Sequence, residues 1–489
     1  MDSIDVLTIR PPAFFTSGIT ASIYPEEIFP STYLDNNSIS SRLLNADFLH
    51  HNRKITLYPD IDDYIFLKER LKRFLKEKNL KWKYVRKNIL KLDPKIIFIL
   101  VRSISNFSST LKVAEIAKRV NPEIKVGVWK AGNEFHQHSM SLKYLKNRCI
   151  DFVVIGEPEY TILEVSKNLL KRKGVSKIKG LVIRNKDNKI IFTGKRRYEY
   201  NLNNLPIPNR DLILDKKYYP PSSFGFVEGG RGCTYRCNYC IWGGIPFRLR
   251  DPRVVIREIM QVYTKYGTRE FYFIMSSFLH SRKWAREICN FIRKFKLDIV
   301  FKIYANLNQI DKKIIKELKS AGCISLCVGL ESGDFTTLKS MNKISNLNLE
   351  KVKKAIETIK SSGIFLRTGV IIGNPDENLE QMMNSIQIIK EVKPDFFRVQ
   401  FLVPMPGTSF YEKSKSMKML IDENLDEYLT SEIKIKQMVD VQTLKSIWTK
   451  YAKLSDLSDS IVLRKKFLNC KFLKCKIFEY IRYLKSITS

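Results

Sequence analysis

Strand-like and helix-like segments alternate along two long stretches of this 489-residue chain, and that alternation limits its possible folds more than any other feature. In the first stretch, apolar runs such as 96–101 and 152–155 are separated by helix-like segments. Strands that alternate with helices form βαβ units, which require a parallel sheet with right-handed crossovers. The pattern therefore predicts an α/β protein. Residues 16–52 are polar and weakly patterned, and we predict no element there.

The second stretch, residues 224–411, contains six strand-like segments with helix-like segments between them. This pattern predicts an open (β/α)6 barrel, whose functional residues lie at the C-terminal ends of its strands. Residues 1–200 are expected to form a Rossmann-like parallel sheet that ends in an antiparallel hairpin at 180–193. Residues 201–223 are expected to be a linker, because prolines at alternate positions prevent both helix and ladder. Residues 412–489 read as a helical, basic C-terminal region.

The chain is strongly basic, with 85 Lys and Arg against 50 Asp and Glu and a formal net charge of +35. Such an excess favours an anionic partner, although solvated lysines spread over the surface explain it equally well. Basic residues are dense in the helix-like segment 68–91 and in the tail 461–489. The tail has the apolar stripe of an interfacial helix, and a packed terminal helix with a solvated lysine face fits the same pattern.

The sequence predicts a cytoplasmic protein that is not integral to a membrane. The N-terminus lacks the positive and apolar regions of a secretory signal, and no apolar run approaches the ~18 residues of a spanning helix. The basic segments leave a peripheral position at an anionic membrane surface open. Of nine cysteines, three are tightly clustered, and in a reducing compartment such a cluster indicates metal binding before disulfides.

The three clustered cysteines are Cys233, Cys237 and Cys240, with the spacing C-x3-C-x2-C directly after the first strand of the predicted barrel. Thiolates are soft ligands that suit zinc or iron–sulfur clusters, and a structural zinc site needs a fourth ligand at a short spacing. The next cysteine, Cys289, lies inside a predicted helix. Three thiolates leave one iron of a four-iron cluster open to chelate a substrate.

This cysteine motif, with Tyr239 before its last cysteine, resembles the radical S-adenosylmethionine (radical SAM) family. The resemblance implies that the open iron of a [4Fe-4S] cluster binds the amino and carboxylate groups of SAM. One electron, from a donor such as a ferredoxin or flavodoxin, then cleaves SAM to a 5′-deoxyadenosyl radical. That radical abstracts hydrogen from an unactivated carbon.

Further segments resemble the same family in the same order. They are G-L-E-S-G at 329–333, L-K-S-M-N-K at 338–343, G-V-I-I-G-N-P at 369–375 and P-M-P-G-T at 404–408. The resemblance implies that Tyr239, Glu331 and Ile371 contact SAM. The second strand ends in Ser276 and Ser277 where acidic residues are common in the family, and we expect these hydroxyls to hydrogen-bond the amino acid part of SAM. Asn306 stands where an Arg is common.

The N-terminal region resembles the cobalamin-binding module that precedes the barrel in one radical SAM subfamily. No G-x-G-x-x-G motif follows an early strand, which argues against dinucleotide binding. A histidine-ligated cobalt is not expected, because none of the five histidines lies in a D-x-H-x-x-G motif. Either cobalamin binds without a histidine ligand, or the module is a relic that shapes the substrate channel. His136 and His138 follow a strand end and are candidate site residues.

The resemblance leaves two reaction outcomes open, radical methylation of a carbon and carbon–carbon bond formation or rearrangement. The basic surface and tail favour a lipid or a membrane-associated small molecule as substrate. The alternatives are an RNA-modifying radical SAM protein and an enzyme that modifies a natural product. Nucleic acid is the less favoured partner, because no RNA-binding module follows residue 411 and no second cysteine cluster precedes the barrel.

Overall fold

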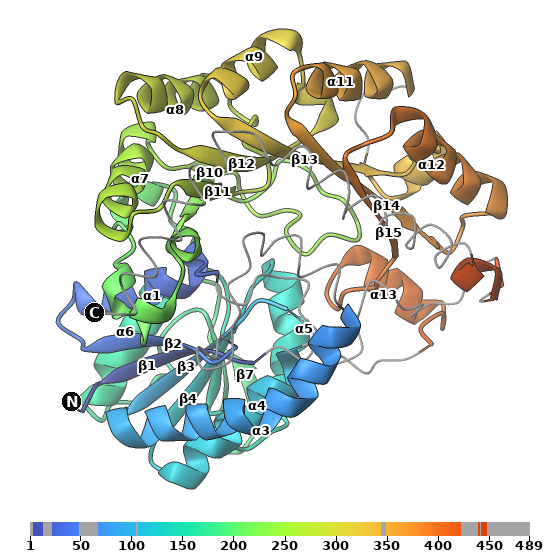
Figure 1. Cartoon of the computed structure of the whole chain (residues 1–489). Helices are drawn as coiled ribbons and strands as arrows, with labels where there is room; N and C mark the ends of the chain where they lie inside the picture. The colour runs from blue at the N-terminus through green and yellow to red at the C-terminus, as the bar shows by residue number, and fades with distance from the viewer. Residues whose placement is uncertain are drawn as a thin grey trace. The chain divides into compact units, whose positions relative to one another are not determined.

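The computed structural model of the chain describes residues 3–12, 22–47, 67–103, 106–343, 349–421, 439–440 and 442–446. Contacts divide the chain into two compact units. The first runs from Met1 to Tyr219 and the second from Pro220 to Glu423 (Figure 1). Each unit is an α/β assembly with a largely or wholly parallel sheet. The α/β fold class predicted from the alternation of strands and helices is confirmed.

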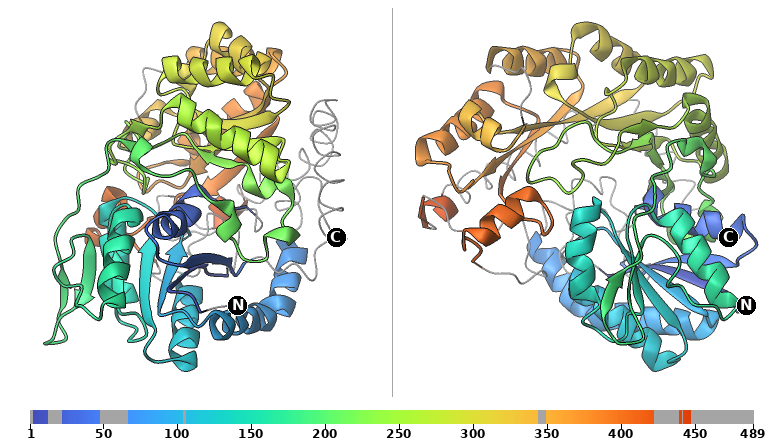
Figure 2. Two further views of the ribbon diagram at one scale, coloured as in Figure 1. Left: turned by 90° about the vertical axis from the view of Figure 1, so that its left-hand side faces the viewer. Right: turned by 180° about the vertical axis from the view of Figure 1, so that it is seen from behind.

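The first unit contains a seven-stranded sheet in the order β2-β1-β3-β4-β5-β6-β7. Its elements are β1 (Val6–Arg10), α1 (Pro25–Asp35), β2 (Ser41–Asn45), α3 (Leu67–Leu92), β3 (Ile96–Val101), α4 (Phe107–Val120), β4 (Lys125–Lys130), α5 (Glu134–Tyr144), β5 (Phe152–Val154), α6 (Pro158–Leu170), β6 (Leu181–Arg184) and β7 (Ile190–Phe192). The strands β2, β1, β3, β4 and β5 are parallel, whereas β6 and β7 run antiparallel. Helices cover both faces of the sheet (Figure 2). The predicted hairpin is therefore confirmed as β6 and β7.

Helix α1 and strand β2 lie in the segment for which the sequence predicts no element. Polar contacts explain the difference, because α1 packs on the sheet partly through hydroxyl groups. The Ser31 and Thr8 hydroxyls are 2.7 Å apart, and the Ser41 hydroxyl donates to the Ser31 carbonyl at 2.7 Å. All three side chains are buried. A buried face that contains hydroxyl groups lacks the apolar periodicity on which sequence-based prediction depends.

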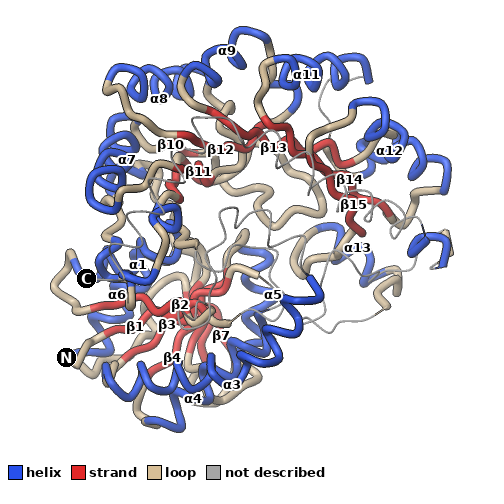
Figure 3. The backbone as a smooth tube through the Cα atoms, in the orientation of Figure 1, coloured by secondary structure: helices blue, strands red, loops and turns tan. Residues whose placement is uncertain are grey.

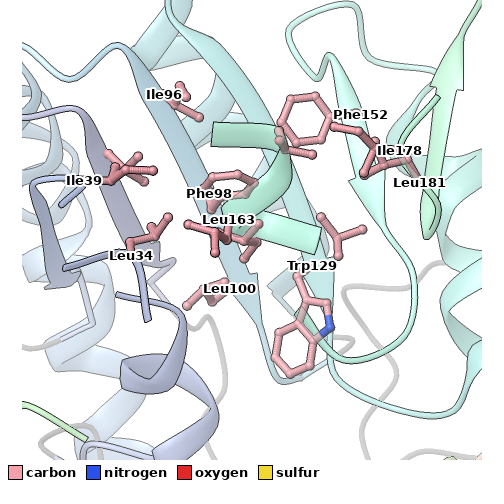
Figure 4. Packing of buried hydrophobic residues seen from close by; sticks show 14 of the residues in the cluster. Leu34, Ile39, Ile96, Phe98, Leu100, Trp129, Phe152, Leu163, Ile178 and Leu181 are labelled. Carbon is pink, nitrogen blue, oxygen red and sulfur yellow. The ribbon is translucent and has the colours of Figure 1, made fainter. Parts of the chain in front are cut away.

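The core between the first sheet and the helices α1 and α6 consists of aliphatic and aromatic side chains from both layers (Figure 4). Phe98 of β3 and Phe152 of β5 meet edge to face, with ring centroids 5.7 Å apart. The Trp129 indole donates to the Gly156 carbonyl at 2.8 Å. This bond ties the loop after β5 to β4, so the C-terminal ends of adjacent strands are fixed to one another.

Strand β7 forms one edge of this sheet and is apolar and exposed. Its residues Ile190, Ile191 and Phe192 are each about two-fifths exposed. The Phe192 ring contacts the ring of His138 on α5, with centroids 4.4 Å apart. Within the described residues, the side chains of this edge strand are therefore only partly covered by neighbouring side chains.

The segment expected to be a linker packs against the first unit as far as Tyr219. It contains the 3-10 turns η3 (Leu202–Asn204), η4 (Arg210–Leu212) and η5 (Lys216–Tyr218). Leu202 and Leu205 form a small core with Phe29 of α1, and the Leu214 amide donates to the Leu43 carbonyl at 2.9 Å. The alternate prolines thus end the regular elements while the apolar side chains between them dock.

The second unit contains a six-stranded sheet in the order β15-β14-β13-β12-β11-β8, with every adjacent pair parallel. Its elements are η6 (Pro221–Phe224), β8 (Phe226–Glu228), β9 (Gly230–Arg231), β10 (Arg248–Leu249), α7 (Pro252–Tyr266), β11 (Glu270–Ile274), α8 (Arg282–Lys294), β12 (Val300–Ala305), η7 (Leu307–Gln309), α9 (Lys312–Ser320), β13 (Cys323–Glu331), α10 (Phe335–Ser340), α11 (Leu349–Ser361), β14 (Phe365–Ile372), α12 (Leu379–Val392), β15 (Phe396–Phe401) and α13 (Ser409–Ser416). The strands line the inside of an arc whose outside is formed by helices (Figure 3). This is the predicted open (β/α)6 arrangement, with β8 and β15 at its edges.

The two faces of the second sheet differ in polarity. On β14, Leu366, Thr368 and Val370 are buried on the face covered by α11 and α12, whereas Arg367 and Ile371 on the opposite face are half-buried. The helix-covered face is the core, and the other, called the inner face below, carries polar and charged side chains. Because parallel strands place their carboxyl ends at one edge, the loops after them meet there.

None of the helices in the described part of the chain is long and apolar enough to cross a membrane. The predicted helical tail lies mostly outside the described residues, and so do the side chains of α3 up to residue 78.

A fully buried ion pair holds the start of the second sheet together. Arg250 follows β10, and its guanidinium donates to the Glu258 carboxylate of α7 at 2.6 Å and to the Glu228 carbonyl at the end of β8 at 2.9 Å. Both side chains of the ion pair are 0% exposed. The pair therefore joins β8, β10 and α7 around the base of the loop that contains the three cysteines.

The substitution Glu258→Gln is expected to destabilise the protein by about 3–5 kcal/mol, because it leaves the buried Arg250 charge without its carboxylate. Urea denaturation followed by tryptophan fluorescence measures the loss. The control is Glu317→Gln, which breaks the partly exposed ion pair with Arg286 and should cost about 0–1 kcal/mol. Equal losses in the two variants would contradict the role of the buried pair.

Candidate active site

The three clustered cysteines lie in one loop between β9 and β10. The loop is closed at its base, where the Cys233 amide donates to the Ile245 carbonyl at 3.1 Å and the Arg250 amide to the Gly229 carbonyl at 3.0 Å. Cys233, Cys237 and Cys240 are half-buried, and none of them is in a disulfide. The loop thus presents three cysteines outside any disulfide, none of which is fully buried.

Asn238, in the middle of the loop, fixes its position against the segment after β13. Its amide donates to the Met341 carbonyl at 3.1 Å, and its side-chain nitrogen donates to the Ser340 carbonyl at 2.6 Å. The Asn342 side chain donates back to the Arg236 carbonyl at 2.7 Å. The segment 338–343, which the sequence singles out as a family motif, therefore holds the cysteine loop in place.

The donor set fits an iron–sulfur cluster better than a single metal ion. Within the described residues, no group of three or more His, Cys, Asp or Glu side chains converges as one metal ion requires. The thiolates of a four-iron cluster bind different irons, so their sulfurs need not converge on one point. Burial raises the pKa of Cys237, which Lys343 lowers in part, and burial raises the pKa of Cys240 to about 11. The iron atoms of a cluster would supply the positive charge that keeps these sulfurs deprotonated.

Glu331, predicted from sequence to contact SAM, lies at the end of β13 and forms an ion pair with Lys343 at 3.0 Å. Both side chains are less than one-fifth exposed. Burial alone would lower the pKa of Lys343, but Glu331, Cys237 and Cys240 together raise it. Lys343 is therefore a fixed positive charge between the sheet and the cysteine loop.

Two glycines in G-L-E-S-G are explained by close contacts. A Cβ at Gly329 would lie 2.2 Å from the Glu331 carboxylate and 3.0 Å from the Lys343 ammonium group. A Cβ at Gly333 would lie 2.5 Å from the Asn384 carbonyl oxygen of α12. Glu331 itself has a φ of +66°, which side chains rarely adopt, and the β13–β14 register shifts between Gly329 and Glu331. The shift turns the carboxylate toward Lys343.

The two predicted serines after β11 have different surroundings. Ser276 is exposed, and its hydroxyl donates to the Gly232 carbonyl at 2.6 Å, next to Cys233. Ser277 is fully buried and donates to the Gln309 side chain at 2.5 Å. Ser276 thus lies at the cysteine loop, whereas the Ser277 hydroxyl is engaged within the protein. Their expected contact with SAM stays a prediction.

Tyr239 and Ile371 pack against the same core residues, although 132 positions separate them in the sequence numbering. Both pack against a small core formed by Leu402 and Phe410. Burial raises the pKa of Tyr239, and Glu331 adds to the increase. The structure therefore brings the residue before the last cysteine next to the end of β14.

The segment after β14 contains a buried carboxyl. One Glu377 oxygen accepts hydrogen bonds from the amides of Gly373 at 2.7 Å and Asn374 at 3.1 Å. Glu377 and Asn374 are both less than one-twentieth exposed. Burial raises the pKa of Glu377 to about 7, despite these hydrogen bonds. The carboxyl shapes the turn at the end of β14 and is protonated at mildly acidic pH.

Sequence reasoning missed His280, Gln309 and the role of Lys343. The His280 ring lies 3.2 Å from the Ser276 hydroxyl and is tilted against the Phe247 ring, with ring centroids 4.6 Å apart. Both His280 and Gln309 follow strand ends, which is the one signal that could have found them. Asn306, at the position where an Arg is common in the family, forms a capping box with Gln309.

The substitution Glu377→Gln is expected to flatten the pH dependence of stability. The raised pKa means that ionising Glu377 opposes folding. The contribution of Glu377 to stability is therefore complete below about pH 4.5 and is lost as the pH rises through about 7. The loss is up to about 3 kcal/mol for this shift. Urea denaturation at pH 5, 6, 7 and 8 measures it. Asp376→Asn, at the exposed neighbour, should keep the wild-type slope, and an unchanged slope in Glu377→Gln would refute the assignment.

Comparison with known sequences identifies the domain that contains this site. The profile of the radical SAM superfamily matches residues 227–389. An uncharacterized methyltransferase of Pyrococcus horikoshii is 28% identical over 373 residues, which cover 75% of this chain and 80% of that protein. The anaerobic magnesium-protoporphyrin IX monomethyl ester cyclase of Rubrivivax gelatinosus is 24% identical over 80% of this chain and 70% of the cyclase.

Solved structures with the same fold cover both units. The cobalamin-dependent S-adenosylmethionine radical enzyme OxsB, with aqua-cobalamin and S-adenosylmethionine bound, matches with a TM-score of 0.71 at 14% identity, over 98% of this chain and 72% of OxsB. The radical SAM methyltransferase TsrM of Kitasatospora setae, with cobalamin and a [4Fe-4S] cluster bound, matches with a TM-score of 0.67 at 15% identity, over 86% of this chain and 80% of TsrM. At these identities the likeness concerns the fold. The superfamily match, together with the cysteine loop and its supporting motifs, shows that this chain contains a radical SAM domain at residues 227–389.

Proposed function

We propose that this enzyme uses a [4Fe-4S] cluster on Cys233, Cys237 and Cys240 to cleave SAM, and that the radical formed acts on an unactivated carbon. Methylation of that carbon is the favoured outcome, and carbon–carbon bond formation is the second. The observation that carries the proposal is the cysteine loop, which Asn238 holds against the segment bearing Lys343. The names of the relatives, methyltransferases and cyclases, support the same two outcomes.

The chain's own residues would hold the reactants as follows. The three thiolates bind the cluster, and Glu331 offers a carboxylate that can accept a hydrogen bond from SAM. The Lys343 ammonium group lies 3.0 Å from the Glu331 carboxylate. Its positive charge balances the negative charge of that carboxylate and of the thiolates. The cluster, when bound, supplies the electron that cleaves SAM. We propose that a ferredoxin or flavodoxin delivers this electron.

The wild-type protein is expected to hold about four irons per chain after anaerobic reconstitution. Cys237→Ala should lose iron and form no 5′-deoxyadenosine from SAM and dithionite, because one iron loses its ligand. The matched control is Cys149→Ala, which removes a half-buried thiol of the first unit and should leave both readouts unchanged. Zinc without sulfide in the wild type, or SAM cleavage at the wild-type rate in Cys237→Ala, would refute the proposal.

We further propose that the first unit binds cobalamin without a histidine ligand from its described residues. His136 is fully buried, and His138 packs against Phe192. At the C-terminal edge of the sheet, Phe135 at the start of α5 is 75% exposed. A Cβ at Gly156, after β5, would meet nothing within 4 Å. An open backbone turn and an exposed aromatic side chain at this edge suit a large planar group.

Wild-type protein incubated with hydroxocobalamin and desalted is expected to retain cobalt in stoichiometric amount, measured by elemental analysis. Phe135→Glu should weaken retention, because it places a charge on the apolar surface at the sheet edge. Leu142→Glu, on an exposed position two turns further along α5, serves as the matched control and should retain cobalt. Loss of cobalt from neither variant, or no retention by the wild type, would exclude this site.

The substrate class remains part of the proposal. A lipid or membrane-associated substrate fits the net charge of +35. A hopanoid C-2 methylase of Rhodopseudomonas palustris, 26% identical over 48% of this chain and 45% of the methylase, is among the relatives. The relatives named above favour a small-molecule substrate over RNA.

A further inference from the structure

We propose that His280 is a positioning residue for the radical SAM site, because its neutral ring bridges the two residues that flank Cys233. This inference rests on the proposed function, in which Cys233 is one of the three cluster ligands. It gives a role to a histidine that no motif marks and that lies outside the cysteine loop.

Each ring nitrogen of His280 is connected to one neighbour of Cys233. The Nδ1 atom lies 3.4 Å from the hydroxyl of Thr234, which directly follows Cys233. The Nε2 atom lies 3.2 Å from the Ser276 hydroxyl, and this hydroxyl donates to the Gly232 carbonyl at 2.6 Å. One imidazole therefore connects the residue before Cys233, through Ser276, with the residue after it.

The hydrogen bonds of Ser276 place a hydrogen on Nε2 of His280. A hydroxyl group has one hydrogen to donate, and Ser276 donates it to the Gly232 carbonyl. The Ser276 oxygen must then accept in its contact with His280, so Nε2 is the donor. Donation therefore runs from the His280 ring to Ser276 and from Ser276 to the backbone before Cys233.

The other ring nitrogen of His280, Nδ1, is an acceptor. The Gln309 side-chain oxygen accepts from the Ser277 hydroxyl at 2.5 Å and from the Asn306 amide at 3.1 Å. The NH2 group of Gln309 therefore faces Nδ1, at 3.4 Å, and the Thr234 hydroxyl can donate to the same nitrogen. The ring is thus in its neutral Nε2–H form, and burial lowers the pKa of His280, which favours that form.

Aromatic side chains near both ends of the cysteine loop contact the His280 ring. The ring centroid of Phe247 lies 4.6 Å from that of His280, and the ring centroid of Tyr235 lies 6.0 Å away. Tyr235 is held in turn by Asn308, whose side chain donates to the Tyr235 hydroxyl at 3.0 Å. None of these residues belongs to a strand of the six-stranded sheet, so the arrangement lies in the loops and not on the inner face of the sheet.

The two ends of the cysteine loop are in close contact beside Cys233. Gly232 has a φ of +83°, and a Cβ there would lie 2.0 Å from the Pro246 carbonyl oxygen. Because the Gly232 carbonyl accepts from Ser276, this backbone cannot turn without breaking the bonds that lead back to His280.

Two sets of contacts therefore share the positioning of the cysteine loop. Asn238 holds its middle against the segment 338–343, and His280 holds the end that carries Cys233. A displacement of about 1 Å at a reacting centre can lower a rate ~10²-fold. The rate of SAM cleavage is therefore expected to depend on His280, although this residue acts only through the loop.

Hydrogen exchange of the full chain, before and after anaerobic reconstitution, tests the positioning role directly. His280→Phe keeps an aromatic ring and removes both ring nitrogens. Its amides at 232–235 should exchange about tenfold faster before reconstitution, because their backbone loses its hydrogen-bonded support. Amides at 338–343 should keep the wild-type rate. Arg286→Gln, which removes a partly exposed ion pair on α8, is the matched control and should leave 232–235 unchanged.

Conservative variants separate hydrogen bonding from packing. The side-chain nitrogen of Gln lies as many bonds from the backbone as Nε2 of His, and that of Asn as many as Nδ1. His280→Gln should therefore keep the bond to Ser276 and most of the wild-type rate of 5′-deoxyadenosine formation. His280→Asn and His280→Phe should lower that rate at saturating SAM by about tenfold. All three variants should hold the wild-type amount of iron, because the three thiolates remain.

Three results would overturn the inference. Equal effects of His280→Gln and His280→Phe would mean that the ring acts through packing alone. Wild-type exchange and wild-type rates in His280→Phe would mean that the loop does not depend on it. An effect of Arg286→Gln as large as that of His280→Phe would assign the change to the surroundings of α8 as a whole.

SAM cleavage by the wild type keeps the two proposals apart. If the wild type forms no 5′-deoxyadenosine, the proposed function fails, whereas hydrogen exchange still decides whether His280 holds the loop. If the wild type cleaves SAM and His280→Phe matches it in exchange and in rate, only the role of His280 fails.

Discussion

The ion pair between Glu331 and Lys343 is the interaction around which the active site is arranged. It links the end of a central strand to the segment that holds the cysteine loop, so the sheet is connected to the loop through that segment. Its geometry requires a residue without a side chain at Gly329 and a left-handed backbone at Glu331. Such strain costs of order 1–3 kcal/mol and persists where surrounding contacts impose it. In this site, the strained backbone accompanies an ion pair that holds a fixed positive charge, the Lys343 ammonium group, beside the thiols.

Much of this site could be predicted from the sequence, because its chemistry is concentrated in short motifs. The cysteines and Glu331 are recognisable by spacing and flanking glycines. The role of Asn238 could not be predicted, because it depends on a contact across about a hundred residues. The role of Lys343 could not be predicted either, because the backbone irregularity at Glu331, which lies beside this ion pair, is visible only in the folded chain. Nor does any motif mark His280, which is placed by the end of β11. Short-range patterns thus revealed the ligands, whereas the residues that position them became visible only in the folded chain.

The elements of the fold also separate into those that the sequence predicts and those that it does not. An apolar run such as β3 was predicted because burial on both faces requires continuous hydrophobic residues. Helix α1 and strand β2 were not, because their contacts include buried hydroxyls and their sequences contain few apolar repeats. The docked segment after residue 201 was taken for a linker because its prolines prevent regular structure, a property that does not prevent packing. Local propensity determines which secondary structure a segment forms, and tertiary contacts determine where that segment packs.

The exposed edge strand β7 shows how growth of the first sheet is stopped. An apolar strand with an open edge is a template on which a second molecule could add a strand and begin aggregation. Here the turn before the strand carries Lys186 and Lys189. Two copies that approach edge to edge would bring these like charges together. Part of the chain's positive charge therefore lies where it opposes addition of a second copy to this edge.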